Sequence, residues 1–288
     1  MLNIDYKLLS KVLATRIKSV INKVVHSDQI GFLEERFIGE GIRKVQDTIQ
    51  LIEREEREGY ILQLDFQKAF DSIEWDFMFD TLKSFNFGKN IIEMIALCYT
   101  NIESCVLNGG FTTNWFCLQK GVRQGCPLSA YLFLLCIEIL AQTIRNNNQI
   151  HGITCGQTEQ KLSLFADDCT CLLKDTRSVQ TTLQEINNFG LYSGLKLNTQ
   201  KSVLYPISNK HQLKDNNLNL TIKTDTISLL GINLGQDKNI NYHHNVSEKC
   251  ITMQQNLNRW SQRQLSLVGK ILVTKSYAIS KLDRKSVV

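Results

Sequence analysis

The strongest constraint on the fold is an acidic pair that interrupts two apolar runs between residues 161 and 173. KLSLFA and CTCLL lie on either side of Asp167 and Asp168, and this pattern predicts a strand, a turn and a second strand. Residues 60–66 also read as a strand, because every second residue is apolar and Asp65 falls on the opposite face. The chain must therefore build a sheet that carries carboxylates at the ends of its strands.

Apolar residues at helical spacing cover much of the remaining chain, so we expect a mixed helix and sheet (α/β or α+β) fold. Asn108, Gly109 and Gly110 form a hairpin-turn composition between two short strands within 103–120. Residues 131–140 are apolar all round and predict a helix buried on every side. Further helices are expected at 7–25, 38–58, 73–85, 91–100 and 178–193, near Trp260 and at 266–282, and further strands at 195–198, 202–206 and 227–234.

The net charge of +5 is unevenly distributed. Residues 1–26 hold five basic side chains against Asp5, and residues 249–288 hold eight against Asp283, so the interior is net acidic. Basic ends and an acidic middle suit a protein that grips a polyanion and concentrates carboxylates for metals. Solvated basic helix faces without a partner are the alternative.

Other classes of protein fit less well. With 43% hydrophobic residues, the 288-residue chain can bury a core. No apolar run is long enough for a membrane span, and no signal peptide is evident, so an intracellular protein is expected. The nine cysteines lack paired CxxC spacing, which favours reduced thiols. His243, His244 and Cys250 are a tempting metal cluster, but neighbouring side chains diverge on regular elements and a fourth ligand is missing, so we expect a polar loop or helix start.

A pair of divalent cations about 3.5 to 4 Å apart would find ligands in Asp65, Asp167 and Asp168, if their strands are neighbours in the sheet. Mg²⁺ prefers a few carboxylates on rigid supports and leaves its other positions to water and phosphates. An Asp-Asp pair in a hairpin is also common turn chemistry, because Asp tolerates left-handed conformations. The residues alone leave both readings open.

Five blocks in order resemble the reverse transcriptase family, specifically its non-LTR (LINE-type) retrotransposon branch. The resemblance covers essentially the whole chain. It implies a right-hand polymerase whose palm is an antiparallel sheet backed by helices, with fingers at 1–59, palm at 60–235 and a partial thumb at 236–288. The blocks are QLDFQKAFDSIEWDF at 63–77, KGVRQGCPLSAYLF at 120–133, KLSLFADD at 161–168, GLKLNTQKS at 194–202 and SLLGINL at 228–234.

The resemblance also implies roles for single residues. Asp65, Asp167 and Asp168 match the metal ligands of two Mg²⁺ ions, with Mn²⁺ as a substitute, and Lys201 matches a general acid for the leaving pyrophosphate. Phe66, Phe70, Gln124 and Gly125 match the dNTP pocket, where the ring of Phe70 would exclude a ribose 2′-hydroxyl. Asp71 is expected to order a helix start. Arg36, in QIGFLEERF at 29–37, resembles a fingers arginine that clamps phosphates or template, although Glu35 replaces the small residue usual before it.

The implied activity is RNA-directed DNA polymerase, with an RNA template, a DNA primer and dNTPs as partners. Ala130 replaces a proline common in the pocket block and Phe165 a common tyrosine, and neither change touches the carboxylates. The first fingers block and the thumb look shortened, and the parent ribonucleoprotein is expected in cytoplasm and nucleus. Alternatives are a catalytically inactive nucleic-acid-binding remnant, a group II intron-type reverse transcriptase and a two-metal nuclease.

Overall fold

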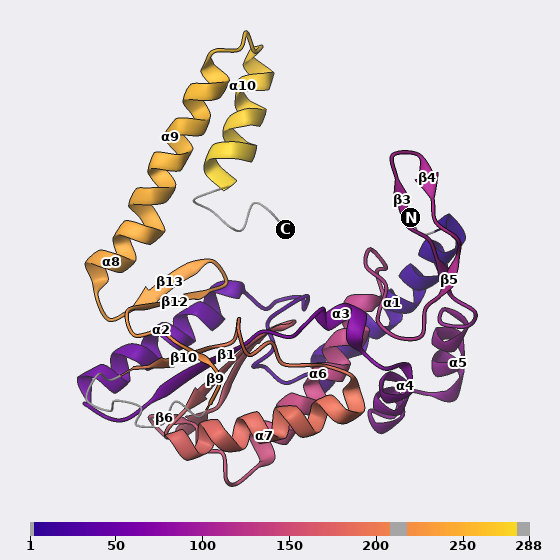
Figure 1. Cartoon of the computed structure of the whole chain (residues 1–288), viewed down its shortest axis with the longest axis horizontal. Coiled ribbons are helices and arrows are strands. Elements are labelled where there is room, and N and C mark those ends of the chain that lie inside the picture. The colour runs from indigo at the N-terminus through magenta and orange to yellow at the C-terminus, as the bar shows by residue number, and fades with distance from the viewer. Residues whose placement is uncertain (1–2, 208–217, 281–288) are drawn as a thin grey trace. The chain divides into compact units, whose positions relative to one another are not determined.

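The computed structural model describes residues 3–207 and 218–280, and the chain divides into two compact units, Met1–Thr224 and Asp225–Val288. Figure 1 shows the elements of both. The expected palm ends later, at residue 235. In the structure, the residues beyond Thr224 group with the C-terminal helices, and the boundaries of fingers, palm and thumb stay predictions.

The first unit is built on a five-stranded sheet with the order β11-β10-β1-β9-β8. All of its pairs are antiparallel except β10 with β11, and β1 pairs with β9 from Tyr60↔Leu173 to Leu64↔Cys169. The strands are β1 (Tyr60–Leu64), β8 (Leu162–Phe165), β9 (Asp168–Leu173), β10 (Val203–Pro206) and β11 (Thr221–Ile222). The expected antiparallel sheet is therefore confirmed, and its central strand β1 is the one that leads to Asp65.

Helices cover both faces of this sheet. Leu162 and Leu164 of β8 share an apolar pocket with α6 (Ser129–Asn146), and α7 (Thr176–Ser193) contacts β1 and β9. On the opposite face α2 (Ile38–Arg54) packs against β8, and Gly41 of α2 lies over the side chain of Ser163. Figure 1 shows α2 and α7 on opposite sides of the strands. The first unit thus has a buried sheet between two helical layers.

The other elements of the first unit surround α6. Helix α1 (Ile4–Val24) contacts α6 and α5 (Lys89–Leu97), and α4 (Trp75–Ser84) follows the short α3 (Ala69–Ser72). Two hairpins complete the unit: β2 (Glu103–Ser104) pairs with β5 (Phe116–Cys117) around β3 (Leu107–Asn108) and β4 (Phe111–Thr112), and β6 (Ile153–Cys155) pairs with β7 (Thr158–Gln160). Helix α6 is buried along most of its length, as its all-apolar sequence predicts.

The second unit starts with the hairpin of β12 (Thr226–Leu229) and β13 (Ile232–Gly235). The helical segments α8 (Lys238–Tyr242), η1 (His243–Ser247) and α9 (Glu248–Ser261) follow, and then α10 (Leu267–Val273) and η2 (Thr274–Ile279). Segment η2 returns alongside α9, with the rings of Trp260 and Tyr277 at 5.4 Å between centroids. The two expected C-terminal helices are confirmed over the described residues.

Three details differ from the sequence-based expectations. The strand expected at 195–198 is wrong, because only Leu197 forms an isolated bridge there, with Phe66. The strand expected at 227–234 is two strands, since Leu230 and Gly231 turn the chain with positive φ. The hairpin of β6 and β7 was not predicted. No helix in the described part of the chain is long and apolar enough to cross a membrane.

Candidate active site

The three predicted carboxylates gather at one end of the sheet. Asp168 is the first residue of β9, and Asp167 belongs to the two-residue turn that joins β8 to β9. Asp65 lies one residue beyond the last β1–β9 pair, Leu64↔Cys169, so continuing this register sets Asp65 opposite Asp168. Residues facing each other across antiparallel strands have Cα atoms about 4.5 to 5.5 Å apart and side chains on the same face. The fold therefore joins two acidic sites that are far apart in sequence.

The backbone on either side of Asp65 is held by the loop that leads into β10. The N–H of Asp65 donates to the buried hydroxyl of Ser202 (3.1 Å), and its C=O accepts from the N–H of Asn198 (2.8 Å). Asn198 in turn accepts from the N–H of Lys201 with its C=O and its side-chain oxygen. Lys201 is exposed. One loop thus fixes the backbone of Asp65 and carries Lys201 beside it.

A strap of backbone hydrogen bonds ties the 120–133 block to the segment after Asp65. The N–H of Val122 donates to the C=O of Phe70, and that of Gly121 donates to the C=O of Ile73, both at 2.7 Å. The indole N–H of Trp75 donates to the C=O of Gly121 (2.9 Å). Two of the sequence blocks are therefore held together directly after the strand that leads to Asp65.

The expected pocket residues lie along this strap. Gln124 is exposed, and its Nε2 donates to a carboxylate oxygen of Asp71 at 3.4 Å. Asp71 therefore holds Gln124, whereas we expected it to order a helix start, and Lys68 is the N-cap of α3 without a side-chain cap. Gly125 is exposed with φ +79°, a left-handed conformation that favours glycine.

The two phenylalanines expected near the nucleotide differ in their exposure. Phe66 is only 7% exposed, and its side chain packs in the main core. Phe70 is half-buried, and its ring stacks on Phe133 of α6 with centroids 4.4 Å apart. A ring stacked on a buried neighbour is held in one orientation, as a steric filter requires.

The comparison with family models decides the identity of this arrangement. Residues 1–234 match the family described as "Reverse transcriptase (RNA-dependent DNA polymerase)". The chain belongs to the reverse transcriptase family.

The curated relatives of this reverse transcriptase are retrotransposon proteins. It is 25% identical over 289 residues to the "Transposon TX1 uncharacterized 149 kDa protein" of Xenopus laevis, covering 98% of this chain and 22% of that protein. It is 30% identical over 193 residues to the "Retrovirus-related Pol polyprotein from type-2 retrotransposable element R2DM" of Drosophila melanogaster, covering 67% of this chain and 18% of that protein. The chain thus spans about a fifth of the length of these relatives. They place it in the non-LTR branch.

Telomerases are among the solved structures with a similar fold. The telomerase of Candida tropicalis in complex with a fragment of telomeric RNA aligns with a TM-score of 0.54 at 12% identity, over 93% of this chain and 44% of that one. The Candida albicans enzyme aligns with the same TM-score at 11% identity, over 96% of this chain and 45% of that one. At such identities the likeness concerns the fold, and it confirms a polymerase fold for the reverse transcriptase.

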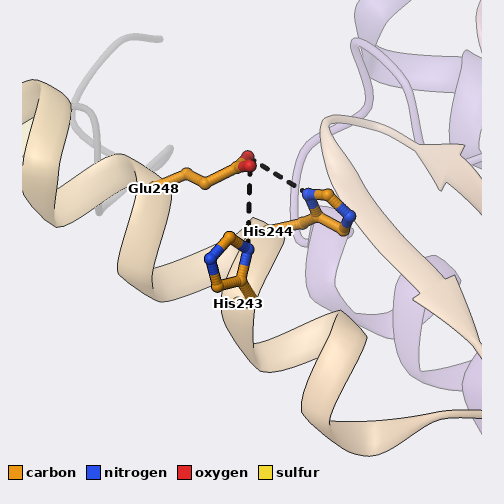
Figure 2. A group of neighbouring side chains, drawn as sticks. All are labelled: His243, His244 and Glu248. Atoms are coloured by element: carbon orange, nitrogen blue, oxygen red, sulfur yellow. Dashed lines mark ion pairs between the residues drawn. The ribbon is translucent and has the colours of Figure 1, made fainter.

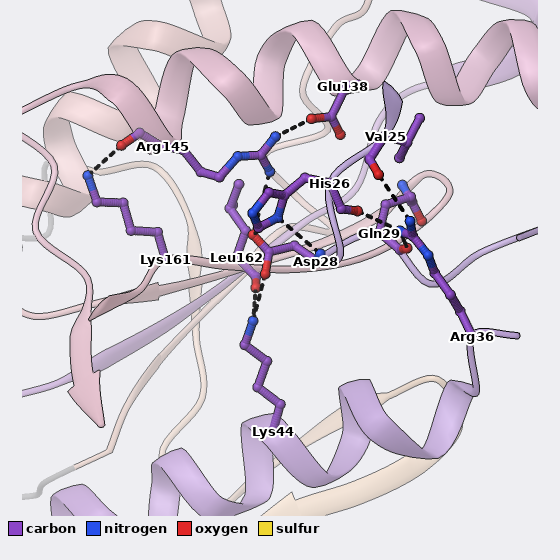
Figure 3. Close-up of polar contacts among 10 residues, drawn as sticks. All are labelled: Val25, His26, Asp28, Gln29, Arg36, Lys44, Glu138, Arg145, Lys161 and Leu162. Carbon is purple, nitrogen blue, oxygen red and sulfur yellow. Dashed lines mark hydrogen bonds and ion pairs between the residues drawn. The ribbon is translucent and has the colours of Figure 1, made fainter. Parts of the chain in front are cut away.

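Arg36 is engaged away from the carboxylate cluster in this reverse transcriptase. Its guanidinium donates to the C=O groups of Val25, His26 and Gln29, and at 3.5 Å to that of Asn22. Figure 3 shows the side chain of Arg36 reaching toward Val25, His26 and Gln29. Asn22 lies in the last turn of α1, Val25 is its C-cap and the other two residues follow it, so the guanidinium ties the helix end to the segment after it. The predicted contact with phosphates or template stays a prediction.

Two of the three residues considered as a metal cluster do meet in the structure. His243 and His244 lie in the π-helical segment η1, and Glu248 pairs with their Nδ1 atoms at 3.7 and 3.1 Å (Figure 2). The expected divergence of the two imidazoles is wrong, and Glu248 takes the place we considered for Cys250. These side chains are half-buried or exposed and offer three ligands, whereas structural zinc sites use four.

Sequence reasoning missed two residues that hold the site in this reverse transcriptase. Ser202 lies within a recognised block but was given no role, although it anchors Asp65. Gln29 lies at the start of the block that contains Arg36, and its side chain contacts the turn next to Asp167. Full burial of a polar side chain is the signal that identifies both residues, and the burial of Gln29 can be seen only in the folded chain.

Proposed function

We propose that this chain catalyses RNA-templated DNA synthesis, adding a dNMP to the 3′-end of a DNA primer with release of pyrophosphate. The observation that carries the proposal is the β1–β9 register, which sets Asp65 opposite Asp168 beside Asp167. Membership of the reverse transcriptase family supports the same activity. The Mg²⁺ ions, the nucleic-acid partners and the role of each side chain are part of the proposal.

The donor set fits divalent cations. Three carboxylates share one sheet end, and both aspartates of the hairpin are exposed, so oxygen ligands are available without burial of an uncompensated charge. Asp65, Asp167 and Asp168 would hold two Mg²⁺ ions, which activate the primer hydroxyl and neutralise the charge of the triphosphate when they are bound. Ser202 and Asn198 keep the backbone of Asp65 in place for this role.

The residues along the strap would bind the incoming nucleotide. Gln124 is oriented by Asp71, and Gly125 takes a left-handed backbone that leaves its surroundings open. The ring of Phe70, fixed on Phe133, would favour deoxyribose because a 2′-hydroxyl would clash with it. Lys201 would donate a proton to the leaving pyrophosphate, a role that its exposed ammonium on the Asn198 loop allows.

Basic helices would provide the contacts with template and primer. Lys7, Lys11 and Arg16 are exposed along α1, and Arg259 and Lys270 are exposed on α9 and α10. Exposed Lys and Arg side chains bind phosphates without reading sequence, and their contribution falls as salt rises. Lys281, Arg284 and Lys285, which add to the basic C-terminal segment, lie outside the described residues.

A primer-extension assay tests the proposal. The wild-type chain, Asp167→Asn and the control Asp76→Asn are compared on an RNA template annealed to a DNA primer, with dNTPs and Mg²⁺. Asp76 is a matched control because it is an exposed aspartate in the first turn of α4. We expect Asp167→Asn to lose extension by a factor of about 100 or more, since a carboxylate ligand is lost, and Asp76→Asn to keep it.

Two outcomes would contradict the proposal. Normal extension by Asp167→Asn would remove the assigned metal role. Salt-dependent binding of the primer-template by the wild-type chain, with no Mg²⁺-dependent extension, would favour the inactive nucleic-acid-binding remnant.

A further inference from the structure

The side chain of Gln29 makes the most buried polar contact next to the carboxylates. Gln29 is fully buried, and its Oε1 accepts from the N–H groups of Gly31 and Ala166, both at 2.9 Å. Two N–H donors on one oxygen fix which way the amide points. Its Nε2 has no hydrogen-bond partner among the described residues. The hydrogen bonds of this side chain are therefore made by its oxygen.

The residue that receives this support is under backbone strain. Ala166 has φ +54°, a left-handed conformation that a residue with a Cβ adopts at a cost of about 1 to 2 kcal/mol. It is the first residue of the two-residue turn, and Asp167 is the second. A strained residue persists only when its surroundings hold it. The hydrogen bond from the N–H of Ala166 to the side chain of Gln29, which is distant in sequence, helps to keep Ala166 in this conformation.

The backbone on either side of Gln29 lies close against β8 and the turn that follows it. Residues 28–30 run beside β8, where the N–H of Leu164 donates to the C=O of Asp28 (2.9 Å) and the N–H of Ile30 donates to the C=O of Leu164 (2.8 Å). A Cβ at Gly31 would come within 2.7 Å of the backbone nitrogen of Ala166. Only glycine at this position allows the segment to lie so near the turn.

A polar cluster holds this segment in turn, as Figure 3 shows. The carboxylate of Asp28 pairs with Lys44 of α2 (2.8 Å), with Arg145 of α6 (3.5 Å) and with His26 (3.1 Å). Arg145 also pairs with the buried Glu138. Residues from both helical layers thus meet on the segment that carries Gln29. Arg36 adds a bond to the C=O of Gln29 itself.

We propose that Gln29 is a positioning residue that holds the Ala166-Asp167 turn in the conformation that presents Asp167 to metal. The proposal rests on the proposed function for its catalytic consequence only. Whether Gln29 holds the turn, which we call the Gln29 clamp, is measured independently of catalysis, by the exchange of the Ala166 amide hydrogen.

Two variants separate the carbonyl oxygen of Gln29 from its size and its amide nitrogen. Gln29→Met keeps a similar length and removes the acceptor, so the N–H groups of Gly31 and Ala166 lose their partner. Gln29→Glu keeps an acceptor oxygen and replaces an amide nitrogen that makes no bond among the described residues by an ionisable hydroxyl, which burial favours in its neutral, protonated form. Thr182→Val is the control, because it removes a fully buried hydroxyl whose bond stays within α7.

Two measurements are made on each full-length chain. Hydrogen exchange is followed on a peptide covering 164–168, and primer extension is followed over a range of Mg²⁺ concentrations. For Gln29→Met we expect exchange in the turn to rise about tenfold or more, the effect of one lost buried hydrogen bond. We also expect the half-saturating Mg²⁺ concentration to rise about tenfold, because a mispositioned ligand weakens metal binding. Gln29→Glu should stay closer to the wild type in both, and Thr182→Val should change neither.

The outcomes are distinguishable. If Gln29→Met lowers thermal stability as Thr182→Val does, but leaves both the exchange of the turn and the Mg²⁺ dependence within twofold of the wild type, Gln29 is an ordinary core residue and the inference is overturned. If the wild-type chain adds no nucleotide, the polymerase proposal fails, and hydrogen exchange still decides whether Gln29 holds the turn. If Gln29→Met does not fold, loss of protection in Gln29→Asn, whose oxygen lies one methylene short, supports the clamp, and full protection overturns it.

Discussion

The bond between the N–H of Asp65 and the hydroxyl of Ser202 offers a direct test of how the site is held. Ser202→Ala removes the acceptor and leaves the N–H of a half-buried residue to find water. A buried donor left without a partner costs about 1 to 3 kcal/mol, and partial exposure of Asp65 favours the lower half of that range. For a unit of this size, about 1 to 2 kcal/mol corresponds to a melting temperature lower by roughly 2 to 8 °C.

The matched control is Ser178→Ala. Ser178 is also fully buried, and its hydroxyl accepts from the backbone N–H of His151 at 2.9 Å, so the two serines have the same kind of bond. Both variants should lose similar stability in thermal unfolding. Only Ser202→Ala should slow primer extension at saturating Mg²⁺, by about tenfold to a hundredfold, because it frees the backbone of Asp65, the proposed metal ligand.

Three results would contradict the proposed role of the bond between Asp65 and Ser202. Equal stability losses with unchanged extension in both variants would mean that Asp65 keeps its position without Ser202. An unchanged melting temperature for Ser202→Ala would mean that the bond contributes nothing in solution. A slowed reaction in Ser178→Ala would mean that general loosening of the unit, and not the anchor, limits the rate.

Three further predictions address single side chains. Arg36→Lys should lower the melting temperature, because one ammonium cannot replace a guanidinium that donates to four carbonyls. In steady-state primer extension the variant should keep the KM for dNTP within twofold of the wild type. A KM raised about tenfold with unchanged stability would instead support a contact between Arg36 and phosphate. Gly121→Ala should cost about 2 to 4 kcal/mol in urea unfolding, since the residue has φ +87° and a Cβ would lie 2.7 Å from the backbone oxygen of Asp71; a loss below about 0.5 kcal/mol would mean that the strap moves freely. At pH 8, iodoacetamide should label the exposed Cys117 and spare Cys171 until the chain unfolds, because burial raises the pKa of the Cys171 thiol to about 12 and keeps the thiol neutral at pH 8. Labelling of both cysteines at similar rates, followed by mass spectrometry of the peptides, would mean that the sheet opens readily.

Much of the architecture follows from local patterns in the sequence. The expected strand, turn and strand are confirmed as β8 and β9, whose short apolar runs are buried on either side of Asp167 and Asp168. Helix α7 ends at Gly194 with φ +78°, as a glycine after a helical stripe predicts. These features depend on residues close in sequence, which is why the sequence alone is enough for them.

The parts that escaped prediction depend on distant partners. Arg36 matches a motif, yet its donors are occupied by the carbonyls of Val25 and His26 just after α1, and only the folded chain shows that the two segments meet. Ser202 bonds to Asp65 and Gln29 bonds to Ala166, next to Asp167, and each pair is separated by 137 positions in the sequence. The expected strand at 195–198 failed because the loop bonds to the backbone of Asp65 and Gln67 on one side only, without a ladder.

The position of β1 in the sheet has a consequence during synthesis on the ribosome. Its two neighbours, β9 and β10, leave the ribosome more than 100 residues after it. Until then, an apolar strand has both edges open, the kind of segment that pairs with other nascent chains. A chaperone that covers residues 60–64 of the emerging polypeptide would therefore raise the yield of correctly folded protein, and a nascent chain halted before residue 168 would remain prone to aggregate.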